Sequence, residues 1–197
     1  ELAGATTLNA TTTQTTTSYY NLRVTCTNDN TFAFSNEVTV TSPPTPGGIY
    51  TIGAGATTWN VPPGSGNGGG TNFATFQEAI DAMSCGIQPG GVIFNVVNAT
   101  YNEQLIIPYI PNSSAANTVT FNGFGATLQY ATTAAQRAVV KLNGADYIRF
   151  DNFIINPTGA SNGYGFHIVN NADSNIISNN TININATSTA TSFAGVV

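Results

Sequence analysis

A repeat of 27 residues in the second half of the chain constrains the fold more than any other feature of the sequence. Residues 139–156 align with residues 166–183 without a gap, and a weaker copy, residues 118–124, aligns with residues 147–153. A period of roughly 20–30 residues made of short apolar strands is typical of a β-solenoid. Identical residues recur in the pairs Asn143/Asn170, Ala145/Ala172, Asp146/Asp173, Asn152/Asn179, Ile155/Ile182 and Asn156/Asn183.

The repeat predicts coils in which each strand pairs with the same strand of the next coil, about 4.8 Å away. Short apolar strands are expected at residues 92–97, 104–107, 118–121, 138–142, 147–155, 165–169 and 175–184. Asparagine suits the corners because it tolerates left-handed backbone and can hydrogen-bond to an asparagine stacked above it. We therefore assign structural corner roles to Asn143, Asn152, Asn170 and Asn179. The side chains expected to point inward are Val139, Leu142, Ile148, Phe150, Ile155, Ile168, Ile177 and Ile182.

The composition agrees with stacked coils, because columns of like charges would repel one another. Charged residues make up 7% of the chain, against roughly 25% in an ordinary soluble domain, while Thr and Asn number 30 and 25. A net charge of −5 with four Lys+Arg excludes nucleic acid as a partner. No apolar run approaches the roughly 18 residues of a membrane span. One His and two Cys provide no zinc-binding pattern.

One helix is predicted at about residues 75–84, immediately before the β-rich part. Thr75 and Glu78 form a capping box. In this motif the Thr75 hydroxyl accepts from the Glu78 N–H, and the Glu78 carboxylate accepts from the backbone N–H of the N-cap residue. The apolar residues that follow recur at helical spacing, and Gly86 can end the helix. We expect this helix to cover one end of the core. The residues at helical spacing are Phe76, Ala79, Ile80 and Met83.

The chain is expected to contain three segments. Residues 1–43 alternate in the manner of β-strands, and strands at 20–26 and 36–41 with a polar loop between them predict a hairpin. Residues 44–70 are a Pro/Gly-rich linker that contains a short strand at 49–53. Residues 71–197 then form the helix and the first coils of the solenoid.

The first segment contains Tyr19-Tyr20, Val24-Thr25-Cys26-Thr27 and Ser35-Asn36-Glu37-Val38-Thr39-Val40. In these residues it resembles the last strands of immunoglobulin-like modules in large bacterial surface proteins. The resemblance implies that Cys26 is the second cysteine of an inter-sheet disulfide, with its partner upstream of Glu1. Cys85 is expected to be a small buried residue at the end of the helix.

In the β-rich part, the predicted helix is followed by residues 90–96 and then by Ala99-Thr100-Tyr101-Asn102-Glu103. This order resembles the opening of the pectinesterase and pectate-lyase superfamily, in which a helix precedes a strand and a Gly-Thr-Tyr-x-Glu segment. This chain has alanine in place of the glycine. The fold that the two resemblances imply is all-β: a partial immunoglobulin-like β-sandwich followed by a right-handed parallel β-helix with one N-terminal capping α-helix.

Asp146 and Asp173 are the strongest candidates for a chemical site, because the repeat places them one coil apart. Two close carboxylates with Lys141 and Arg149 nearby could share a calcium ion or a proton. The alternative, which we favour, is that both aspartates cap corner turns. His167 aligns with Val140 of the neighbouring coil and is expected to face outward. The paired aspartates and arginine of pectinesterase-like enzymes have no counterpart in the chain.

Taken together, the resemblances imply the type of long adhesin that gliding bacteria export by type IX secretion. The expected function is that of a structural or adhesive module on the cell surface, with no catalytic residues and no cofactor other than the calcium considered above. The expected partners are neighbouring modules, glycans or other surface proteins. Two alternatives remain open: a polysaccharide lyase or esterase whose site lies on later coils, and a subunit of an extracellular filament.

Overall fold

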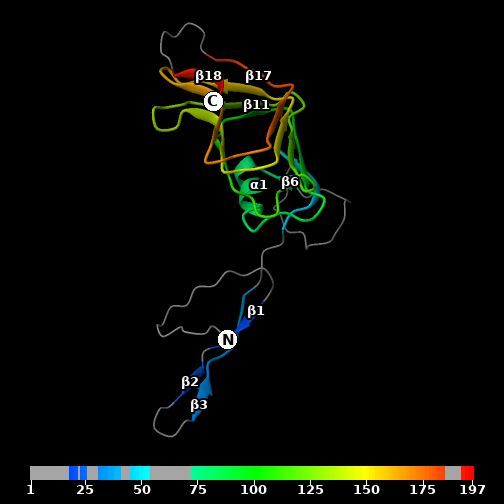
Figure 1. Cartoon of the computed structure of the whole chain (residues 1–197), viewed down its shortest axis with the longest axis vertical. Coiled ribbons are helices and arrows are strands. Elements are labelled where there is room, and N and C mark those ends of the chain that lie inside the picture. The colour runs from blue at the N-terminus through cyan, green and yellow to red at the C-terminus, as the bar shows by residue number, and fades with distance from the viewer. Residues whose placement is uncertain (1–17, 22, 26–30, 41–44, 54–71, 185–191) are drawn as a thin grey trace. The chain divides into compact units, whose positions relative to one another are not determined.

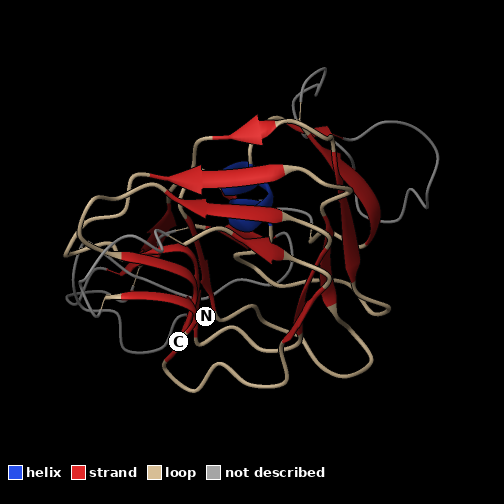
Figure 2. Ribbon diagram, turned by 90° about the horizontal axis from the view of Figure 1, so that it is seen from above, coloured by secondary structure: helices blue, strands red, loops and turns tan. Residues whose placement is uncertain are grey.

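The computed structural model describes residues 18–21, 23–25, 31–40, 45–53, 72–184 and 192–197 (Figure 1). The chain forms two compact units, Glu1–Pro43 and Pro44–Val197. In Figure 2 strands account for almost all of the regular structure, and α1 (Phe76–Ala82) is the one helix of the described residues.

The second unit consists of three sheets in which every pair of neighbouring strands is parallel. Sheet one has the order β16 (Ile176–Ser178), β13 (Ile148–Asp151), β10 (Val119–Asn122), β7 (Val92–Val96), β5 (Gly48–Ile52), β6 (Asn72–Phe73). Sheet two has the order β17 (Thr181–Ile182), β14 (Ile154–Pro157), β11 (Thr127–Tyr130), β8 (Thr100–Tyr101). Sheet three has the order β18 (Phe193–Val196), β15 (Gly163–Val169), β12 (Ala138–Asn143), β9 (Leu105–Pro108).

The chain visits the three sheets in turn, so that β7-β8-β9 is one coil, and three further coils follow. This arrangement confirms the prediction of a parallel β-solenoid. The weak sequence copy is also confirmed, because Val119 pairs with Ile148 and Phe121 with Phe150. Strand β5 lies in the segment predicted as a linker, yet it pairs along its length with β7.

Two long predicted strands are each divided in two. Residues 147–155 form β13 and β14, separated by a corner at which Asn152 has φ 57°. Residues 175–184 form β16 and β17, separated by a corner at which Asn179 has φ 54°. Left-handed backbone turns the chain from one sheet to the next, and the apolar residues on both sides conceal this turn in the sequence. Strands β6, β8 and β11 were not predicted.

The predicted register is wrong by one residue along β12 and β15. Lys141 pairs with His167 and Asn143 with Val169, whereas the repeat predicted Val140 opposite His167. The 27-residue spacing returns at the corner, where Asn170 Nδ2 donates to Asn143 Oδ1 at 2.6 Å. The corner that follows β15 contains one residue more than the corner that follows β12. Asn170 and Asn171, both at φ 57°, accommodate the additional residue.

A column of phenylalanine rings fills the interior behind sheet one. The Phe94 and Phe121 ring centroids are 5.0 Å apart, and those of Phe121 and Phe150 are 4.9 Å apart, with interplanar angles of 20° and 18°. All three side chains are completely buried. Five of the eight side chains predicted to point inward are completely buried, and Ile168, Ile177 and Ile182 pack partly buried against the core.

Helix α1 is shorter than predicted and packs against the same core. Thr75 is its N-cap and accepts from the Glu78 N–H, while the Glu78 carboxylate accepts from the N–H of Ala74 at 2.7 Å. The Phe76 ring is buried and lies 5.2 Å from that of Tyr101 and 6.0 Å from that of Phe121. Figure 1 shows α1 and β6 on the side of the solenoid away from β17 and β18.

The first unit contains four short strands that pair antiparallel. Strand β1 (Ser18–Tyr20) pairs with β4 (Val38–Val40), and β2 (Arg23–Thr25) pairs with β3 (Phe32–Phe34). Phe32 and Phe34 are 57% and 55% exposed. The unit is therefore a hairpin, as far as its described residues go, and Cys26 lies outside them.

Candidate functional site

The predicted Asp146/Asp173 pair lies at a corner of the solenoid, one coil apart. The backbone N–H of Asp173 donates to Asp146 Oδ1 at 2.6 Å, so the Asp146 carboxylate joins one coil to the next. Asp146 is half-buried and Asp173 is exposed. No group of three or more His, Cys, Asp or Glu side chains that could hold a metal ion occurs within the described residues. This geometry has the form of a corner cap, and the calcium site stays a prediction.

The four corner asparagines that the repeat singled out take up two arrangements. Asn143 and Asn170 are hydrogen-bonded to each other through their side-chain amides. Asn152 and Asn179 adopt left-handed backbone, and Asn179 Nδ2 donates to the Asp151 carboxylate at 2.7 Å. Each arrangement connects successive coils or turns the chain at a corner.

Asn175 and Asn180 span the gap between coils, and the repeat did not identify them. Asn180 Oδ1 accepts from the Phe153 N–H at 2.8 Å, and its Nδ2 donates to the Phe150 carbonyl at 3.0 Å. Asn175 makes the same pair of bonds to Ile148 and Ala145. The residues 27 positions earlier are Ile148 and Phe153, so no identity marks these two asparagines in the aligned sequence.

Side chains on the outer faces of the sheets also hydrogen-bond from coil to coil. On sheet two, Gln129 Nε2 donates to Asn102 Oδ1 at 2.6 Å. Three similar bonds follow the same 27-residue spacing: Asn183 to Asn156 at 2.8 Å, Asn122 to Asn95 at 3.0 Å, and Ser178 to Asp151 at 2.7 Å.

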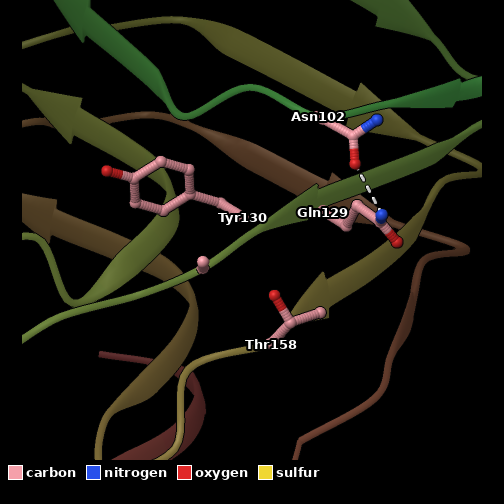
Figure 3. A pocket seen from close by; sticks show the side chains of 5 residues that line it. Asn102, Gln129, Tyr130 and Thr158 are labelled. Atoms are coloured by element: carbon pink, nitrogen blue, oxygen red, sulfur yellow. Dashed lines mark hydrogen bonds between the residues drawn. The ribbon is translucent and has the colours of Figure 1, made fainter.

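A shallow pocket of about 280 Å³ lies beside β11 (Figure 3). We call it the amide pocket. Three successive coils contribute to it, since Asn102 follows β8, three residues belong to or follow β11, and Thr158 follows β14. Its lining residues are Asn102, Gln129, Tyr130, Ala131 and Thr158, all uncharged.

The loops that border the amide pocket are fixed by a buried threonine. The Thr132 side chain is 5% exposed; its hydroxyl donates to the Asn162 carbonyl and accepts from the Gly159 N–H. A side chain at Gly159 would collide with Thr132, because a Cβ there would lie 2.1 Å from the Thr132 carbonyl oxygen. The segments that carry Ala131 and Thr158 are thereby held together.

Comparison with known proteins gives no relative. No protein-family model, curated protein or solved structure matches the chain. No helix of the described residues is both long and apolar enough to cross a membrane.

His167 is half-buried on the outer face of sheet three. Its ring centroid is 5.6 Å from that of Tyr164, and Lys141 is its partner in the neighbouring strand. Burial lowers the pKa of His167 below its ordinary value, and the positive charges of Lys141 and Arg137 lower it further. Within the described residues, no carboxylate hydrogen-bonds to the His167 ring to orient it.

Glu103 and Tyr101 fasten the first coil to the helix and to sheet one. The Glu103 carboxylate accepts from the Phe76 N–H at 3.5 Å, and the Tyr101 hydroxyl donates to the Val97 carbonyl at 2.8 Å. Burial raises the pKa of Glu103, and the Glu78 carboxylate adds to this rise, while the N–H groups at the start of α1 oppose it. These residues belong to the Thr-Tyr-x-Glu segment, whose role here is structural.

The prediction for Cys85 is wrong. Cys85 is an exposed free thiol, whereas the two residues after it, Gly86 and Ile87, are buried. The chain turns at Gly86, which has φ 105°. This turn places Ile87 in the core in the position that the sequence suggested for Cys85.

Proposed function

We propose that this chain is a structural and adhesive module of a large extracellular surface protein. In this proposal the first unit is part of an immunoglobulin-like sandwich, and the second is the start of a right-handed parallel β-helix. Crossover connections between parallel strands are right-handed in nearly all proteins, which supports that hand.

The single observation that carries the proposal is the hydrogen bonding between side chains of successive coils. Bonds such as Asn143–Asn170 and Asn102–Gln129 repeat along the stack, in addition to the backbone bonds of the sheets. Most of these bonds join neutral amides, which do not titrate in the physiological range and are weakly affected by salt. A fold stabilised by such bonds should be little affected by pH and salt, which suits a protein that projects into a variable external medium.

We further propose that α1 caps the core at one end of the solenoid. An uncovered end would expose the apolar interior and the edges of the strands. The buried Phe76 side chain, together with the Thr75 and Glu103 contacts at the start of the helix, supports this role.

A test of the proposed function is adhesion of beads coated with the purified chain to immobilised polysaccharides and to cell surfaces. The expected result is retention under flow with no release of soluble sugar. Depolymerisation of the polysaccharide would instead support a carbohydrate-active enzyme. Regular polymers of the chain in electron micrographs, without adhesion, would support a filament subunit.

A further inference from the structure

We propose that the amide pocket binds a neutral sugar ring of a glycan. This inference rests on the proposed adhesive function and gives that function a ligand class and a place on the surface. It concerns the outer face of sheet two, at the strand ends of β11 and β14.

The amide pocket has the dimensions of a site for a small ring. Ligand pockets commonly enclose roughly 300–1,000 Å³, so a volume of about 280 Å³ places this pocket at the lower end. The lining extends over three coils, which is about 10 Å along the stack. A single ring can occupy the pocket while the rest of a chain continues along the outer face of sheet two.

The lining presents the groups that a sugar requires. A pyranose carries hydroxyls around its edge, so it fits uncharged donors and acceptors. The Tyr130 ring packs partly buried against the core and borders the pocket. Within the described residues, no hydrogen bond occupies Asn102 Nδ2, Gln129 Oε1 or the Thr158 hydroxyl, which leaves donors and an acceptor for the ligand.

These groups are held in place before any ligand arrives. The Gln129–Asn102 bond orients both amides, as Figure 3 shows, and leaves one polar end of each available. The Tyr130 hydroxyl donates to the Gln136 side chain, which fixes the direction of the ring. Thr132 joins the two bordering loops. A preformed site loses little conformational entropy on binding, and this favours affinity for a small ligand.

The absence of charge from the lining selects for a neutral ligand. The described cations of the second unit, Arg137, Lys141 and Arg149, are not among the lining residues. An acidic sugar would lose hydration in the amide pocket without gaining an opposite charge. Binding of a neutral sugar should therefore change little with ionic strength.

The test is a glycan array that contains neutral and uronic-acid polysaccharides, followed by calorimetry of the 197-residue chain with the best neutral oligosaccharide. Gln129→Leu and Thr158→Val alter side chains that are half-buried or exposed, so both variants should fold; circular dichroism checks this. We expect each to weaken binding by at least about fivefold, because each removes one hydrogen bond. Thr127→Ala, on β11 but outside the lining, is the matched control and should bind like the wild type.

The outcomes separate the two proposals. Binding of the neutral oligosaccharide that survives both Gln129→Leu and Thr158→Val overturns the amide pocket but leaves the adhesive function standing. Binding only to uronic-acid polysaccharides, weakened by 0.5 M salt in the manner of charge pairing, also overturns it. If the beads adhere to no glycan and no surface, the proposed adhesive function itself fails.

Discussion

Asn180 uses both ends of one side-chain amide to span two coils. Its oxygen accepts from the Phe153 N–H and its nitrogen donates to the Phe150 carbonyl, so one side chain satisfies two backbone groups at a corner. Asn152 and Asn179 instead adopt the left-handed backbone of the turn, and Asn143 and Asn170 bond side chain to side chain. Asparagine is therefore used in three ways at the corners, and the last two recur as identities in the sequence.

Replacing Asn180 with alanine should destabilise the chain more than a surface substitution does. The change leaves two backbone groups of the preceding coil without their partner, at a cost of about 1–3 kcal/mol in the free energy of unfolding. Urea denaturation measures it. The control is Thr181→Ala at an exposed position of the next strand, which should stay within about 0.5 kcal/mol of the wild type. Equal stability of the two variants would contradict the bridging role.

Calcium should leave the melting temperature unchanged, because Asp146 already accepts the Asp173 N–H and Asp173 is exposed. Two carboxylates also fall short of the six to eight oxygen ligands that calcium takes. The measurement is thermal melting in a calcium titration against EDTA. A rise with calcium concentration that Asp173→Asn abolishes would establish a metal site at this corner.

Glu103 should make the folded state less stable as the pH rises from about 4 to 7. Its folded pKa is raised above the ordinary value of 4.5, so the folded state binds more protons than the unfolded state in this window. The stabilising contribution is complete below the unfolded pKa and is lost as the pH rises through the folded one. Glu103→Gln should flatten this part of the profile of melting temperature against pH. An unchanged profile in the variant would assign the dependence to other groups.

The strands show how far the sequence can predict the elements. Apolar runs located the strands of sheet one except β6 and those of sheet three except β18, and they identified the core residues Phe150 and Ile155. Strand β8 has two residues, and β11 alternates without a marked apolar run, so neither has a sequence signal of its own. Their positions depend on pairing with the neighbouring coils.

The amide pocket could not be predicted for a related reason. Its lining comes from three coils, and the neighbours Asn102 and Gln129 differ in residue type, so the repeat does not align them as an identity. Thr132 lies in a polar loop and resembles any other threonine in the sequence. Its burial follows from the close approach of the loop at Gly159, which only the three-dimensional fold reveals.

At the level of whole strands, substitutions in the phenylalanine column should lower the free energy of unfolding more than substitutions elsewhere in the core. Phe121→Ala removes a completely buried ring that is stacked between Phe94 and Phe150. A loss of about 3–5 kcal/mol is expected, since a cavity remains in the middle of the stack. Urea denaturation measures it, with Thr120→Ala on the outer side of the same strand as control. A loss below about 1 kcal/mol would mean that the coils close over the gap.

The stability of the whole molecule depends little on charge. The chain has four Lys+Arg and nine Asp+Glu, and its coils are joined mostly by neutral amides and stacked rings. We expect the free energy of unfolding to change by less than about 1 kcal/mol between 0.05 and 0.5 M sodium chloride. Urea titrations at both salt concentrations measure it. A larger change would point to charge interactions that the described residues do not show.

The strands of sheet two keep a constant spacing while the connections after them vary in length, which indicates where new sequence can be inserted. Sheet two keeps the 27-residue spacing through all four coils, whereas the connection to sheet three spans residues 102–104 in the first coil, 131–137 in the second and 158–162 in the third. The connections that begin at Asn102, Ala131 and Thr158 therefore differ in length, whereas the strands of sheet two keep one spacing. Peptides inserted at the exposed Ala134 would give the scaffold a new recognition surface with the core sequence unaltered. The solenoid is in this respect a natural display framework, comparable to a sandwich that carries hypervariable loops.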